Sequence, residues 1–157
     1  MRVPERILID GRSGSGKSEL ARNLTAALGA TLIRLDDFYP GWDGLRAGTD
    51  ILLHSVLAAP RPGYFRWDWT RSAPGDWRDL DPTADWVIEG CGSLSRQTVA
   101  YATVSVWVEC DDRIRKARAL TRDGEMYAPH WERWAAQEDA FIAEENPRAL
   151  ADVIVAG

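Results

Sequence analysis

Residues 11–18 read Gly11-Arg12-Ser13-Gly14-Ser15-Gly16-Lys17-Ser18, and this octapeptide is the strongest pattern in the chain. It matches G-x-x-x-x-G-K-[ST], in which a glycine-rich turn joins a strand to a helix. The apolar run Ile7-Leu8-Ile9 in front predicts a short buried strand, and residues 19–28 place apolar side chains on one face of a helix. Because motif and flanks agree, we interpret this segment as a phosphate-binding P-loop rather than a chance glycine-rich turn.

The residue types in this loop suit a nucleoside triphosphate. Glycines let the backbone curl so that successive N–H groups point at a phosphate, and the following helix N-terminus adds partial positive charge. Lys17 is expected to reach the β- and γ-phosphates of ATP, and the Ser18 hydroxyl to ligate Mg²⁺. The expected nucleotide-binding residues are Gly11, Arg12, Ser13, Gly14, Ser15, Gly16, Lys17 and Ser18.

Size and composition indicate an ordinary globular domain of 157 residues. The net charge of −5 argues against nucleic acid or an anionic membrane as the main partner. Residues 1–6 lack the apolar region of a signal peptide, and no apolar run approaches membrane-spanning length. Cys91 and Cys110 have no metal-like partners nearby in the sequence, so we expect two buried free thiols and a cytoplasmic protein.

Strand-like and helical patterns alternate along the chain. Besides the first strand, buried runs occur at 31–35, 86–89, 104–108 and 153–155, and helices are expected near 50–59, 94–101, 112–122 and 130–145. This alternation predicts an α/β protein with the three-layer P-loop NTPase fold, a five-stranded parallel sheet with helices on both faces. Ligands of such sheets bind beyond the carboxyl ends of the strands.

Acidic residues follow two of the expected strands. Asp36 and Asp37 could assist Mg²⁺ binding or accept a proton from a substrate hydroxyl, although adjacent aspartates are also common in turns. Glu89 ends an apolar strand expected beside the P-loop strand, a Walker-B-like position that would hold Mg²⁺. The alternative for Glu89 is a solvated glutamate at a strand end. The expected metal-binding residues are Ser18, Asp36 and Glu89.

Three arginines share one face of the helix expected at 112–122. Arg115, Arg118 and Arg122 are spaced three and four residues apart, which brings them to the same side. Guanidinium groups bind phosphate oxygens bidentately, so we expect this face to meet the triphosphate. A solvated basic face, partly offset by the acids at 111 and 112, is the alternative.

The segment from Asp36 to Asp85 has the least regular pattern. Phe65, Trp67 and Trp69 alternate there, so they could share one face of an extended strand. Aromatic stripes usually pack in a core, but these side chains could also form a wall for an acceptor substrate. The sequence leaves both interpretations open.

Taken together, these motifs resemble the uridine kinase-like family of P-loop kinases. Four segments match in order: the P-loop, Asp36-Asp37-Phe38-Tyr39, the apolar run ending Glu89-Gly90, and the arginine pattern ending Arg122-Asp123. The resemblance covers most of the chain outside residues 40–85. It implies that Asp36 is the proton acceptor or a Mg²⁺-associated residue, and that Arg118 and Arg122 contact phosphates from a lid.

The resulting hypothesis is an ATP-dependent small-molecule kinase in one domain, residues 1–157. An acceptor-binding segment is expected at about 38–85 and a lid at about 115–130, with Lys17, Asp36, Arg118 and Arg122 as catalytic residues and Arg115 as a further nucleotide contact. The γ-phosphoryl group would pass to a hydroxyl of a nucleoside-like or other small acceptor. The alternative is a P-loop ATPase or nucleotide-dependent switch without an acceptor; the Asn-Lys-x-Asp motif of guanine-specific switches is missing. The sequence does not name the acceptor, distinguish ATP from another triphosphate, or fix the oligomeric state.

Overall fold

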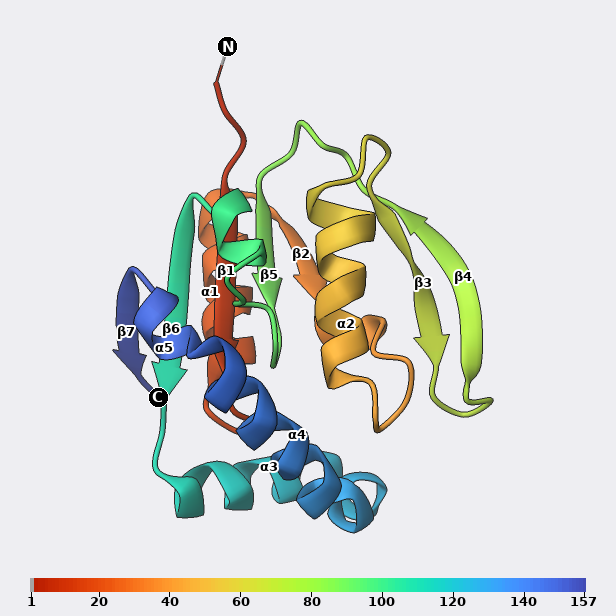
Figure 1. The fold of residues 1–157 in the computed structure, drawn as a ribbon, viewed down its shortest axis with the longest axis vertical. Coiled ribbons are helices and arrows are strands. Elements are labelled where there is room, and N and C mark those ends of the chain that lie inside the picture. The colour runs from red at the N-terminus through yellow and green to blue at the C-terminus, as the bar shows by residue number, and fades with distance from the viewer. Residues whose placement is uncertain (1) are drawn as a thin grey trace.

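A five-stranded parallel sheet forms the centre of the computed structural model, which describes residues 2–157 (Figure 1). Its strands lie in the order β2-β5-β1-β6-β7, which confirms the predicted fold class. Their bounds are β1 Arg6–Gly11, β2 Thr31–Arg34, β5 Trp86–Glu89, β6 Val104–Glu109 and β7 Val153–Ala156. The P-loop strand β1 is therefore central, between β5 and β6.

The alternating side chains of the strands produce two hydrophobic layers. Ile7 and Ile9 of β1 pack in the layer that includes Ala21 of α1 (Lys17–Leu28), while Leu8 packs in the opposite layer with residues of α2 and α4. Figure 1 shows α1 behind the sheet and α4 in front of it. Both faces are covered, as a sheet of near-continuous apolar strands requires.

The front layer and the lower edge of the molecule are helical. The helices here are α2 (Leu45–Ile51), which runs on as the π-helical η2 (Leu52–Leu57), then α3 (Asp112–Tyr127), η4 (Ala128–His130), α4 (Trp131–Glu145) and α5 (Pro147–Leu150). Asp111 caps α3 by accepting hydrogen bonds from the N–H groups of Arg113 and Ile114. Gly124 interrupts α3 with φ 57° and ψ −138°, a conformation that glycine adopts readily.

The prediction of a helix at 94–101 is wrong. Only the short 3₁₀ turn η3 (Thr98–Tyr101) forms there. The reason is local: Thr98 Oγ1 accepts from Ser95 N at 2.8 Å and donates to the Ser93 carbonyl at 2.7 Å, so side chains take the place of helical hydrogen bonds. The preceding loop is held by the carboxylate of Asp10, which accepts from Leu94 N at 2.9 Å.

The segment that looked irregular in sequence forms an antiparallel hairpin of β3 (Gly63–Asp68) and β4 (Ala73–Asp79), beside η2. Tyr64 anchors it, because the buried ring packs on Phe38 at a centroid distance of 4.6 Å. Arg78 donates to the Leu32 carbonyl of β2 at 3.1 Å. A second short turn, η1 (Leu35–Asp37), carries the chain away from β2.

Two further features concern the environment of the chain. Within residues 2–157, no helix combines the length and apolar character needed to cross a membrane. Cys91 and Cys110 are both free, as the sequence predicted, but only Cys91 is fully buried.

Candidate functional site

The glycine-rich loop between β1 and α1 has the geometry of an anion cradle. Gly14 and Gly16 adopt φ values of 78° and 99°, and a Cβ at Gly14 would collide with the carbonyl oxygen of Arg115. Among the described residues, no side chain caps α1 at Gly16. The first N–H groups of the helix therefore remain open to a ligand, and the helix dipole favours an anion there.

A cavity of about 230 Å³ opens above this loop. It brings together six of the sequence-predicted residues: Gly14, Gly16, Lys17, Ser18, Arg118 and Arg122. The full lining is Gly14, Gly16, Lys17, Ser18, Glu19, Arg22, Arg34, Arg118 and Arg122. We call this the phosphate cavity, since four arginines and a lysine supply the charge that a triphosphate needs.

Lys17 is buried beneath this cavity, with 7% of its surface exposed. Burial alone would lower the pKa of Lys17, but neighbouring Cys91 and the carboxylates of Glu89 and Asp36 outweigh it and raise the pKa above the usual value. The ammonium group therefore stays charged at neutral pH, as phosphate binding requires.

Oxygen donors converge beside Lys17 at the ends of β2 and β5. Ser18 Oγ donates to Glu89 Oε1 at 3.1 Å, and Arg34 bridges the two acids with Nε 2.9 Å from Glu89 Oε1 and Nη2 3.1 Å from Asp36 Oδ2. Glu89 is buried, whereas the Asp36 side chain is 57% exposed. Loss of solvation within the cleft and the negative charge of Glu89 raise the pKa of Asp36. The positive charges of Lys17 and Arg34 act in the other direction.

These oxygen atoms suit a Mg²⁺ ion whose other ligands are phosphate oxygens and water. In the described part of the chain, no group of three or more His, Cys, Asp or Glu side chains could hold a metal ion on its own. Ser18, Asp36 and Glu89 nevertheless offer one hydroxyl and two carboxylates on one side of the phosphate cavity. Mg²⁺ commonly binds one or two carboxylates together with substrate phosphates.

The opposite side of the P-loop is tied to α4 by Glu138, a residue that the sequence analysis missed. Its buried carboxylate accepts from Ser13 N at 2.8 Å, from Arg12 Nε at 3.3 Å and from Cys91 Sγ at 3.1 Å. Tyr127 of α3 adds a bond from its hydroxyl to Ser13 Oγ at 2.7 Å. The loop is thus held from behind by both helices.

Five of the predicted nucleotide contacts do not line the phosphate cavity: Gly11, Arg12, Ser13, Ser15 and Arg115. The side chains of Arg12 and Ser13 face Glu138 and Tyr127. Arg115 is buried behind the loop, 2.9 Å from Asp112 and 3.5 Å from the Ser13 carbonyl, and does not line the phosphate cavity. For Arg115, the reason is its position on α3. Arg122 lies seven residues further, about 10 Å along the helix axis, where the cavity opens.

A buried aspartate shapes the neighbouring loop. Asp10, the residue before the P-loop, accepts hydrogen bonds from the N–H groups of Gly11 at 2.7 Å, Gly92 at 3.2 Å and Leu94 at 2.9 Å. Burial raises its pKa to about 7, although these three donors act in the other direction. Asp10 therefore links the end of β1 to the loop after β5.

We expect Glu138→Gln to lower the free energy of unfolding by about 1–3 kcal/mol and to raise the KM for ATP. Glutamine keeps the shape but replaces one acceptor oxygen by an N–H₂ group, which leaves buried donors facing a donor. Urea denaturation and steady-state kinetics measure the two effects. Asp139→Asn is the matched control, because Asp139 also pairs with Arg12 but is 66% exposed. Equal behaviour of the two variants would contradict the assigned role.

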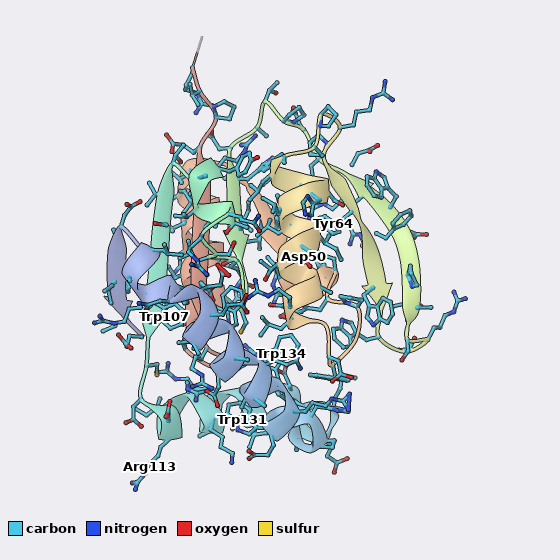
Figure 2. All side chains as sticks on the ribbon, viewed as in Figure 1. Asp50, Tyr64, Trp107, Arg113, Trp131 and Trp134 are labelled. Atoms are coloured by element: carbon cyan, nitrogen blue, oxygen red, sulfur yellow. The ribbon has the colours of Figure 1, made fainter. Side chains whose placement is uncertain are left out.

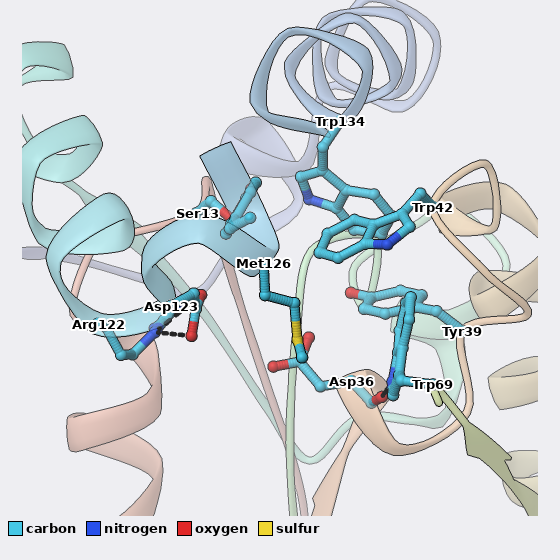
Figure 3. A pocket seen from close by; sticks show the side chains of 10 residues that line it. Ser13, Asp36, Tyr39, Trp42, Trp69, Arg122, Asp123, Met126 and Trp134 are labelled. Carbon is cyan, nitrogen blue, oxygen red and sulfur yellow. Dashed lines mark hydrogen bonds and ion pairs between the residues drawn. The ribbon is translucent and has the colours of Figure 1, made fainter. Parts of the chain in front are cut away.

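A second cavity, of about 160 Å³, lies on the other side of Arg122 (Figure 3). Its lining is Ser13, Asp36, Tyr39, Trp42, Trp69, Arg122, Asp123, Met126, Tyr127 and Trp134. We call it the aromatic pocket. Trp42 is central to it, with ring centroids 4.9 Å from Trp69, 5.4 Å from Tyr127 and 6.4 Å from Trp134.

Of the three residues in the predicted aromatic stripe, only Trp69 lines the aromatic pocket. Trp69 lies just beyond β3, lines the pocket and donates from Nε1 to the Asp36 carbonyl at 3.1 Å. Phe65 is outside it, 58% exposed and packed on Trp77 at 4.9 Å, and Trp67 is also absent from the lining. Trp134 enters from α4, where its ring meets Tyr39 at 4.8 Å (Figure 3).

Arg122 connects the two cavities. It lines both the phosphate cavity and the aromatic pocket, and it makes three hydrogen bonds of 2.8–3.2 Å to Asp123, drawn dashed in Figure 3. A third hollow, of about 400 Å³, adjoins the phosphate cavity and shares Gly16, Glu19 and Arg118 with it. The three spaces adjoin one another through these shared residues, and we refer to them together as the groove.

The sheet order and the P-loop after the central strand define the three-layer P-loop NTPase fold that the sequence predicted. No protein-family model and no curated protein sequence matches this chain. Solved structures do match. A possible uridine kinase from Bacillus stearothermophilus aligns with a TM-score of 0.62 at 20% identity, over 99% of this chain and 90% of that one.

Two other matching structures are named as kinases of different acceptors. A candidate fructose transport system kinase from Silicibacter sp. TM1040 gives a TM-score of 0.58 at 22% identity, covering 98% of this chain and 90% of its own. Shikimate kinase from Acinetobacter baumannii, in complex with shikimate, gives 0.59 at 15% identity, covering 97% and 83%. At these identities the likeness establishes the fold and leaves the acceptor open.

Proposed function

We propose that this protein is an ATP-dependent small-molecule kinase that transfers the γ-phosphoryl group to a hydroxyl of an acceptor in the aromatic pocket. One observation carries the proposal: Arg122 belongs to the walls of both the phosphate cavity and the aromatic pocket. A group transferred from one space to the other would pass this guanidinium. An ATPase has no need of a second pocket beside the triphosphate.

The donor half of the reaction follows from the phosphate cavity. Lys17 and the N–H groups at the start of α1 would hold the phosphates, and the adjoining hollow near Arg118 would take the nucleoside. When bound, Mg²⁺ would neutralise charge on the phosphate oxygens, held by Ser18, Asp36 and Glu89. Loop residues on the far side, fixed by Glu138, would keep the cradle rigid.

Asp36 is suited to the acceptor half. It lies at the end of β2 and lines the aromatic pocket, and loss of solvation and the charge of Glu89 raise its pKa although Lys17 acts in the other direction. We assign it the role of general base that takes the proton as the acceptor oxygen attacks phosphorus. The bond from the γ-phosphorus to the bridging oxygen breaks, and ADP leaves.

The α3 segment would close over the reacting groups as a lid. It carries Arg118 and Arg122, and Gly124 interrupts its helical conformation two residues after Arg122. A closed lid excludes water, which otherwise competes with the acceptor for the phosphoryl group.

We expect Arg122→Ala to lower kcat by about 10²-fold or more, because a guanidinium that stabilises transferring phosphoryl charge acts mainly in the transition state. Steady-state kinetics with saturating ATP measure the loss. Arg113→Ala is the matched control, since Arg113 is on the same helix but projects away from the groove (Figure 2). Unchanged kcat and KM in Arg122→Ala would favour a solvated basic face instead.

The proposed function is tested by an acceptor screen. Purified protein with ATP and Mg²⁺ is supplied with nucleosides, sugars, vitamins and amino alcohols, and ADP is measured. ADP release that depends on an acceptor supports the kinase, while ADP release at the same rate without any acceptor supports the ATPase alternative.

A further inference from the structure

The wall of the aromatic pocket lacks the groups that would bind an anionic acceptor. Arg122 is its one cationic side chain among the described lining residues, and that guanidinium is already bonded three times to Asp123. Asp36 and Asp123 are the two acidic residues of the lining, and Arg34 reaches Asp36 from the phosphate cavity at 3.1 Å. A carboxylate or phosphate on the acceptor would therefore meet two carboxylates and no free cation.

Three polar groups on the wall of the pocket are already bonded within the protein, which leaves fewer donors for a polyhydroxylated acceptor. The Tyr39 hydroxyl donates to the Cys91 carbonyl at 2.6 Å, and the Tyr127 hydroxyl donates to Ser13 Oγ at 2.7 Å. Trp69 Nε1 is bonded to the Asp36 carbonyl. These side chains present ring surface to the pocket while their polar groups are used by the protein.

The rings meet at steep angles and form a box rather than a slot. Trp42 is tilted 53° from Trp69 and 42° from Tyr127, and it stands 89° from Trp134. Trp134 in turn meets Tyr39 at 71°. A box of aromatic rings with carboxylates on its rim is suited to a compact cation, because the faces of the rings are negative.

We propose that the acceptor is a small alcohol that carries an ammonium or quaternary ammonium group. This inference rests on the proposed kinase function and names its substrate class. The cationic group lies in the box around Trp42, and the hydroxyl lies at Asp36. The volume of about 160 Å³ is below the 300 Å³ or more of drug-sized sites, which limits the acceptor to a small molecule.

Arg122 gives this site a dependence on nucleotide. Turned towards a triphosphate in the phosphate cavity, Arg122 releases the carboxylate of Asp123, which then faces the aromatic pocket without its partner. The cation therefore binds more tightly once ATP is in place. In the transfer step the acceptor oxygen bonds to the γ-phosphorus, Asp36 takes the hydroxyl proton, ADP leaves, and the ammonium group is unchanged.

The experiment compares cations with neutral molecules of the same shape. Choline is paired with 3,3-dimethylbutan-1-ol, and ethanolamine with propan-1-ol, in calorimetric titrations with Mg²⁺ and a non-hydrolysable ATP analogue. We expect at least one cation to bind about tenfold or more tightly than its neutral partner, and less tightly when the nucleotide is omitted. Equal affinity within both pairs, or no binding by either cation, would overturn the inference.

Substitutions test whether the carboxylate of Asp123, rather than the general integrity of the fold, produces the preference for a cation. Asp123→Asn should reduce the preference for the cation to less than threefold, while Asp43→Asn, at an exposed residue next to Trp42 that pairs with Arg133, should leave it unchanged. Trp42→Leu should also weaken cation binding. Phosphorylation of neutral alcohols without a preference for cations would refute this substrate class and leave the kinase intact. Cation-selective binding without phosphorylation would refute the kinase and leave the cation site.

Discussion

Lys17→Ala should lower the rate of phosphoryl transfer by about 10²–10³-fold or more, the largest loss that we expect from a single substitution. The ammonium group is buried under the phosphate cavity and kept charged by the acids around it, so no solvent cation replaces it at the same position. Its charge acts on phosphate oxygens both in the bound triphosphate and during transfer. Acceptor-dependent ADP formation measures the loss in kcat.

The chain contains its own control, because Lys116 is the only other lysine. Lys116 lies on α3 with its nitrogen 3.8 Å from Glu132, a largely exposed pair that contributes little to stability. Lys116→Ala should therefore retain wild-type kinetics. Circular dichroism checks that Lys17→Ala is folded, and folded Lys17→Ala with activity within a few-fold of wild type would contradict the assignment of the P-loop.

Asp36→Asn should lower kcat by about 10²–10⁴-fold with a much smaller effect on the affinity for ATP, because a general base acts on the acceptor in the transition state. Asparagine keeps the size of the side chain and cannot accept the proton. Nucleotide binding by calorimetry and turnover by ADP release separate the two effects.

The pH profile provides an independent check on Asp36. The base must be ionised, and its pKa is raised, so activity should fall as the pH drops through a value above the 3.8 of an ordinary aspartate. Asp37→Asn is the matched control, since Asp37 does not line the aromatic pocket. A severe loss in Asp37→Asn together with a mild one in Asp36→Asn would reverse the assignment of the two residues.

The sheet could be predicted from sequence because its strands are buried on both faces. Each strand appears as a short apolar run, and the P-loop motif identifies the first of them as the strand before the phosphate site. The groups expected at the carboxyl edge, such as Lys17, Glu89 and Asp36, follow from that topology alone. Arg34 could have been found by the same rule, since it ends β2 in register with Glu89.

The missed parts depend on contacts between distant segments. Glu138 looks like a surface glutamate on a helix, and only the packing of α4 behind the P-loop makes it a buried partner of Ser13. The aromatic pocket likewise combines Trp42, Trp69 and Trp134 from three separate segments of the chain. The hairpin β3–β4 was hidden because its strands are half exposed and interrupted by a register shift between Phe65 and Trp67.

The placement of Arg115 shows a limit of helical spacing as a guide to function. A shared face predicts which side chains point the same way, but it does not say where along the helix a neighbouring loop ends. Arg115 meets the back of the P-loop, while Arg122, two turns later, reaches the phosphate cavity. Only the tertiary structure distinguishes the two positions.

Phosphorus NMR of the complete reaction tests the central proposal most directly. Wild-type protein is incubated with ATP, Mg²⁺ and each small alcohol in turn, and the products are compared with those of Lys17→Ala. The account predicts a new phosphomonoester signal in amounts equal to the ADP formed, only with an acceptor and at least a hundredfold slower in the variant. Inorganic phosphate released at the same rate with and without acceptors would contradict it.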